Sequence, residues 1–153
     1  MDNKALIEKF YTAFAAADAK GMTDCYGDDI VFEDPAFGPL HGEDAKKMWR
    51  MLIHNSKGNI NVSFSDVEAD DKTGRAHWVA KYEFSATKRP VTNRIWASFE
   101  FKDGKISKHT DRFNVWKWSR QAMGPIGLFL GWSPFLKNKI RQRTKNLLAN
   151  YQG

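Results

Sequence analysis

The chain of 153 residues has one cysteine, Cys25, and only one acidic residue, Asp111, between residue 105 and its end. A single cysteine excludes an intrachain disulfide and any metal site built on several cysteine ligands. The longest apolar run, residues 126–132, is broken by glycines and falls far short of the roughly 18 residues that span a bilayer. The N-terminus shows no signal-peptide pattern. We therefore expect a soluble, cytoplasmic protein, with no metal and no cofactor.

Acidic side chains are scarce in one part of the chain only. Residues 105–153 hold ten basic groups and one acidic group, whereas residues 1–104 hold 14 basic and 17 acidic groups. The formal net charge of +6 therefore reflects a basic C-terminal segment on a mildly acidic body. The basic final helix has only Phe135 and Tyr151 as nearby aromatic residues to stack on bases, so we expect no nucleic-acid partner.

Apolar residues are plentiful and follow two periods. Helical spacing occurs in the first 53 residues, and strand alternation dominates from residue 60. The expected elements are helices at 3–19 and 22–26, a short strand at 30–32, a loop at 35–42, a helix at 43–53, four strands between 60 and 118, and a final helix that Ser133 caps and Pro134 begins. This order predicts an α+β fold, in which a curved, cone-shaped antiparallel sheet wraps around the N-terminal helices and encloses a cavity.

The expected domain covers residues 1–118, and residues 119–153 form a helical extension. We rank three uses of this extension. It packs on its own domain, contributes to a dimer contact, or lies on an anionic membrane surface as a peripheral contact, in that order.

Two motifs suggest a family. Residues 26–35 (YGDDIVFEDP), followed by Gly38 and by His41-Gly42 before a helix, resemble the ketosteroid isomerase and SnoaL-like polyketide cyclase families of the nuclear transport factor 2-like fold. Residues 104–106 (GKI) and 109–111 (HTD) are similar to the last strands of SnoaL-like domains. The resemblance implies a small apolar ligand. It does not imply one reaction, because this fold supports several enzyme types and binding modules.

The resemblance places Asp34 at the general base of ketosteroid isomerase, which needs a carboxylate in an apolar pocket. The alternative is that Asp34 caps the turn into Pro35. The two oxyanion donors of that isomerase fall on Phe10 and Ala97, and Tyr11 is turned about 100° away from the Phe10 position. Because neither matched residue can donate, ketosteroid isomerase activity is not expected.

His109 and Asp111 lie two residues apart on a predicted strand, so they share one face. Facing the cavity they form an acid/base pair, as the resemblance implies, and on the outer face they pair with basic neighbours instead. The residues expected to line the ligand pocket are Phe10, Phe14, Phe32, Trp49, Tyr82, Ala97, Phe99 and Phe113.

Three functions stay open. The first is an isomerase, cyclase or dehydratase that uses Asp34, His109 and Asp111 on an apolar cyclic or polyketide-like molecule. The second is a non-catalytic binding or protein-interaction module. The third is an epoxide hydrolase with Arg94 between Asp34 and Asp111, although the tight Arg-x-Asp pair of that family is missing. Because open sheets of this fold commonly pair, a homodimer is expected.

Overall fold

The structure, a computed structural model, describes residues 2–84, 87–124 and 134–151. The predicted helices and strands are found, several with different bounds. The elements are α1 (Asn3–Ala15), α2 (Ala19–Thr23), β1 (Tyr26–Asp34), β2 (Gly38–His41), α3 (Glu43–Ser56), β3 (Asn61–Ala69), β4 (Thr73–Phe84), β5 (Arg89–Lys102), β6 (Lys105–Arg112), α4 (Val115–Met123) and α6 (Pro134–Asn150).

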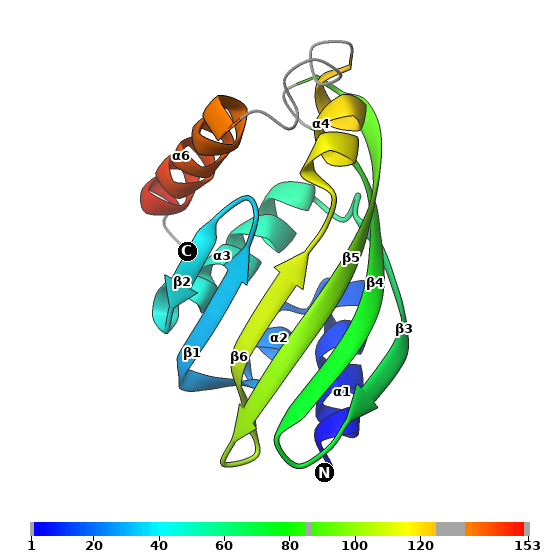
Figure 1. Cartoon of the computed structure of the whole chain (residues 1–153), viewed down its shortest axis with the longest axis vertical. Helices are drawn as coiled ribbons and strands as arrows, with labels where there is room; N and C mark the ends of the chain where they lie inside the picture. The colour runs from blue at the N-terminus through cyan, green and yellow to red at the C-terminus, as the bar shows by residue number, and fades with distance from the viewer. Residues whose placement is uncertain (1, 85–86, 125–133, 152–153) are drawn as a thin grey trace.

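The six strands form one curved, open sheet in the order β2-β1-β6-β5-β4-β3 (Figure 1). Strands β3 to β6 are an antiparallel meander. Strand β1 joins β6 in parallel, and β2 pairs with β1 at the edge. Helices α1, α2 and α3 lie against one face of the sheet (Figure 1). The predicted α+β architecture, with its additional C-terminal helix, is therefore confirmed.

The region predicted as a short strand and a loop contains two paired strands. Gly38 has a φ of +68°, a conformation that favours glycine, and the chain reverses there so that Phe32 pairs with Leu40. Pro39 is tolerated because β2 is an edge strand. The loop prediction was wrong because two prolines and two glycines in eight residues concealed a strand of only four residues.

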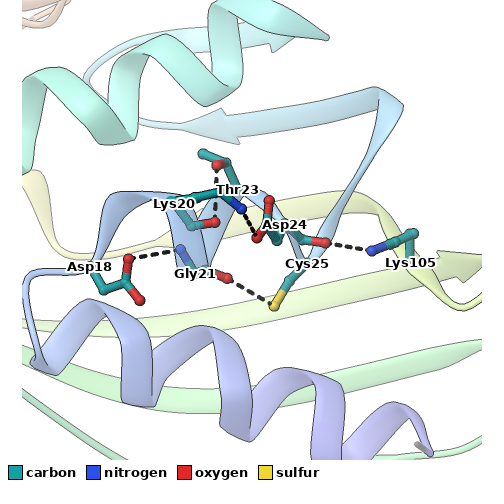
Figure 2. A network of polar contacts seen from close by, with 7 residues as sticks. All are labelled: Asp18, Lys20, Gly21, Thr23, Asp24, Cys25 and Lys105. Carbon is teal, nitrogen blue, oxygen red and sulfur yellow. Dashed lines mark hydrogen bonds and ion pairs between the residues drawn. The ribbon is translucent and has the colours of Figure 1, made fainter.

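The predicted first helix ends at Ala15. The predicted second helix is α2, which begins earlier than expected because Asp18 caps it by accepting from Gly21 N at 3.0 Å. Figure 2 shows how the end of α2 is fixed. The Cys25 thiol donates to Gly21 O at 3.4 Å, and Lys105 Nζ donates to Asp24 O at 2.6 Å. Cys25 is fully buried and burial raises the pKa of its thiol, so it is a structural residue. These bonds join the start of β1 to the start of β6.

The predicted fourth strand ends earlier than expected. Strand β6 stops at Arg112, and Asn114 caps α4 by accepting from Lys117 N at 3.0 Å. The apolar residues from Val115 to Trp118 follow a helix here, so extending the strand to Trp118 was wrong. The predicted domain boundary at 118 falls inside α4.

Helix α6 packs on the same chain. Leu148 is 6% exposed, and the Tyr151 ring lies 5.9 Å from the His54 ring of α3. Figure 1 shows α6 beside the β1–β2 end of the sheet. The predicted cap at Ser133 lies outside the described residues.

Candidate functional site

A chain of hydrogen-bonded side chains crosses the interior, and we call it the buried polar chain. Trp49 Nε1 of α3 donates to the Tyr26 hydroxyl of β1 at 2.8 Å, and this hydroxyl lies 2.7 Å from His109 Nδ1 of β6. His109 Nε2 lies 2.8 Å from Asp111 Oδ1, which also accepts from Trp78 Nε1 of β4 at 3.4 Å. All five residues are at most 7% exposed.

The direction of these bonds follows from chemistry. An ionised Asp111 can only accept, so His109 Nε2 carries the ring proton and Nδ1 accepts from the Tyr26 hydroxyl. The Tyr26 oxygen is then free to accept from Trp49. Burial, followed by the charge of Asp111, raises the pKa of Tyr26 well above its usual value, so the phenol stays protonated. Each polar group in the chain therefore has a partner.

Aromatic rings enclose His109. Its ring stacks on Trp49 at 6.1 Å and 15° and contacts three phenylalanines, Phe99 at 4.5 Å, Phe32 at 5.0 Å and Phe10 at 5.4 Å. His109 is 0% and Asp111 3% exposed. Both side chains thus point into the interior rather than to the outer face of the sheet.

Asp34 lies at the end of β1 and forms a turn with the residues after it. Its Oδ1 accepts from Ala36 N at 2.9 Å and from Phe37 N at 2.6 Å. The turn-capping alternative therefore describes its hydrogen bonds, because Asp-Pro starts a turn.

The same carboxyl has an unusual proton affinity. Burial, and then the charge of Asp111, raise the pKa of Asp34 from 3.8 to about 7. The two backbone N–H groups and the Arg141 guanidinium act in the opposite direction. A half-buried carboxyl that is part-protonated near neutral pH suits general acid/base chemistry.

Tyr82 is the next polar group in this region. Burial raises the pKa of its phenol, and Asp34 contributes to the shift. Its oxygen accepts from Trp118 Nε1 at 2.7 Å. Because the oxygen accepts this bond, the phenol hydrogen of Tyr82 can still donate to another group.

The residues predicted to line a pocket divide into two groups. Tyr82 and Phe113 are half-buried and pack against the core. The remaining six are at most 2% exposed and are core residues: Phe10, Phe14, Phe32, Trp49, Ala97 and Phe99.

The two positions matched to the oxyanion donors carry no hydrogen-bond donor side chain. Phe10 is fully buried, and Ala97 lies opposite Asp111 in the sheet. Tyr11, the neighbour of Phe10, is fully buried as well. Phe10 stacks on Tyr26, and Tyr11 stacks on Phe64. The Tyr11 hydroxyl has no hydrogen-bond partner among the described residues.

The Asp–Arg–Asp grouping does not form. Arg94 is exposed and pairs with Val79 on the outer side of β5, whereas Asp111 points inward. The cation that influences Asp34 is Arg141 of α6.

Sequence reasoning missed Tyr26, Trp118 and Arg141 as site residues. Trp78 was not among the predicted site residues either, although the alternation that identified Tyr82 also directs Trp78 inward. Among the residues that the structure describes, no group of three or more His, Cys, Asp or Glu side chains could hold a metal ion. None of the helices within that same part is both long and apolar enough to cross a membrane.

The curved sheet around α1 and α3, with the buried polar chain inside an apolar core, defines a nuclear transport factor 2-like fold. The SnoaL-like domain family matches residues 7–109, and the chain belongs to that family. No curated protein matches the chain.

Solved structures support the fold. A nuclear transport factor 2-like protein of unknown function from Burkholderia pseudomallei is 15% identical with a TM-score of 0.67, over 79% of this chain and 98% of its own. A candidate polyketide cyclase from Pseudomonas putida is 19% identical with a TM-score of 0.65, over 80% and 98%. An LEH-like epoxide hydrolase from M. tuberculosis is 21% identical with a TM-score of 0.60, over 82% and 93%.

Proposed function

We propose that this protein is an acid/base enzyme, an isomerase, cyclase or dehydratase, that acts on an apolar cyclic or polyketide-like molecule. Asp34 exchanges a proton with the ligand. The observation that carries this proposal is the half-buried Asp34 carboxyl, whose pKa is raised to about 7 by burial and by Asp111. Such a group can accept a proton from carbon and return it at neutral pH.

In this proposal His109 and Asp111 do not contact the ligand but act on Asp34 indirectly. His109 is fully enclosed, so it positions Asp111 through their 2.8 Å contact. The negative charge of Asp111 then favours the protonated form of Asp34. The predicted acid/base pair thus becomes a positioning residue and a charge that tunes the proton carrier.

Tyr82 replaces the missing oxyanion donors. Because its oxygen accepts from Trp118, the hydroxyl hydrogen can be directed to a ligand oxygen. Removing one such donor typically costs about 10²–10³ in rate. A substrate with an already acidified C–H bond needs less help of this kind.

A binding module is the second candidate, because the hydrogen bonds of the buried polar chain also fit a purely structural interior.

For the assembly we propose a homodimer. Trp96 is 60% exposed and its ring lies 4.2 Å from His77 on the outer side of the sheet, where a second copy would cover it. The cytoplasmic location stays a prediction.

The test begins with apolar cyclic compounds that raise the melting temperature of the wild-type protein. Each is incubated in D₂O, and loss of its C–H signal is followed by NMR. We expect exchange with the wild type and with Asp70→Asn, and none above background with Asp34→Asn. Binding without exchange supports the binding module, and exchange that survives in Asp34→Asn excludes Asp34 as the proton carrier.

A further inference from the structure

Helix α6 contacts the turn that carries Asp34. Arg141 Nε donates to Pro35 O at 3.2 Å. The Thr144 hydroxyl lies 2.7 Å from Ala36 O and 2.9 Å from Arg141 O, so its single hydrogen is shared between these two carbonyls. Figure 1 shows the helix beside the β1–β2 end of the sheet, where this turn lies. Arg141 and Thr144 lie beyond residues 7–109, the part that matches the SnoaL-like domain.

The bonds from α6 reach the same peptide groups that bind Asp34. The Pro35–Ala36 peptide accepts from Arg141 at its oxygen and donates to Asp34 at its nitrogen. The Ala36–Phe37 peptide accepts from Thr144 and donates to Asp34 in the same way. A peptide group is planar and rigid, so a bond that fixes its oxygen also orients its N–H. Such linked hydrogen bonds strengthen one another.

We propose that Arg141 and Thr144 are positioning residues that hold both peptide groups of the Asp34 turn and thereby fix the Asp34 carboxyl. The inference rests on the proposed function only in the use that it assigns to Asp34. The C-terminal helix is then a part of the acid/base site and not only a cover for the sheet.

The charge of Arg141 also affects the pKa of Asp34. Two charged groups act electrostatically on Asp34, Asp111 on β6 and Arg141 on α6. The charge of Asp34 in turn raises the pKa of Tyr82 on β4. Asp111 raises the pKa of Asp34 and Arg141 lowers it. The helix therefore limits how far burial can shift this carboxyl toward the protonated form.

The first experiment measures amide hydrogen exchange by NMR in the full chain. We expect Thr144→Val to accelerate exchange at Ala36 and Phe37 by roughly two- to tenfold, the usual worth of one hydrogen bond. Thr144→Ser keeps the hydroxyl and restores slow exchange. Lys72 and Thr73, whose amides bind Asp70 in the same manner, serve as the internal reference and do not change.

The second experiment titrates the Asp34 carboxyl by carbon-13 NMR. Arg141→Gln raises its pKa, Arg141→Lys keeps it close to wild type, and Lys145→Gln, an exposed charge on the same helix, leaves it unchanged. Unaltered exchange in Thr144→Val together with an unaltered titration in Arg141→Gln overturns the proposal. Neither readout needs turnover, so this inference and the proposed enzymatic role of Asp34 can fail separately.

Discussion

Two aspartates of this chain make the same turn, but their pKa values are shifted in opposite directions. Asp34 Oδ1 accepts from Ala36 N and Phe37 N at 2.9 and 2.6 Å, and Asp70 Oδ1 accepts from Lys72 N and Thr73 N at 2.8 Å each. The pKa of Asp34 is raised to about 7, mainly by burial. The pKa of Asp70 is lowered, first by its bond from the Thr73 amide.

The comparison separates local from global effects. Backbone N–H donors favour the carboxylate in both turns. Asp70 lies in the exposed connection between β3 and β4, where water solvates its charge. Asp34 lies at the end of β1, where α6 contacts the following turn, and burial and the like charge of Asp111 outweigh the same two donors. A turn motif therefore does not reveal the chemistry of its carboxyl.

Replacement by asparagine gives the largest contrast. Asp34→Asn keeps an oxygen for the two amides but cannot exchange a proton, and we expect the rate of C–H exchange or turnover to fall by about 10²–10⁴. Asp70→Asn is the matched control and keeps the wild-type rate. Equal rates in the two variants would contradict the functional difference between the turns.

Stability should differ in sign between the two sites. Because the folded pKa of Asp34 lies above its ordinary value of 3.8, the folded state binds the extra proton between pH 4 and 7, and its contribution to stability falls as pH rises through this range. We expect Asp34→Asn to be more stable than wild type at pH 8 by about 2 kcal/mol, about half the full value because solvent screens a half-buried group.

Asp70 behaves in the opposite way, since its lowered pKa stabilises the fold above the unfolded value and this contribution is lost in acid. Asp70→Asn is therefore less stable than wild type at pH 8, and the gap closes as pH falls below 4. Urea unfolding of both variants at pH 8, 6, 4 and 3 measures the two trends, and trends of the same sign would refute the assignment.

A smaller change removes the charge next to Asp34. Asp111→Asn lowers the pKa of Asp34 below 7, because its second raising influence is gone, and it leaves Asp70 unaffected. The amide oxygen can still accept from His109, so the free energy of unfolding changes by about 1 kcal/mol. Carbon-13 titration of both aspartates in the one variant measures the effect and its control together.

The smallest effect concerns the exposed turn. Lys72 lowers the pKa of Asp70 only weakly, so Lys72→Gln produces a slight rise that added salt abolishes. Asp34 does not respond. A rise that persists in 1 M salt would mean that the two turns differ by more than exposure.

Local patterns predicted much of the fold. Period-two alternation identified β3 to β5, and Asp103-Gly104 predicted the turn into β6 because short-range turn chemistry determines a tight hairpin. They failed at β2, because two prolines and two glycines in eight residues concealed a four-residue strand that pairs with β1.

The same limit applies to the site. Asp34, His109 and Asp111 were identified as candidates, and the structure buries the latter two in contact with each other. Tyr26 and Arg141 were missed because their roles depend on β1 pairing in parallel with β6 and on α6 reaching Pro35. The hydrophobic periodicity within one segment does not predict which distant segment it contacts.

The bonds from α6 to Pro35 and Ala36 join positions 106 and 108 residues apart. During synthesis the residues of the Asp34 turn emerge early and must wait for nearly the whole chain before these last two bonds can form. The entropy of closing so long a loop grows only slowly with its length, so the late arrival of α6 costs time more than stability. The proton affinity of Asp34 therefore depends in part on a contact that cannot form until α6 has been synthesised.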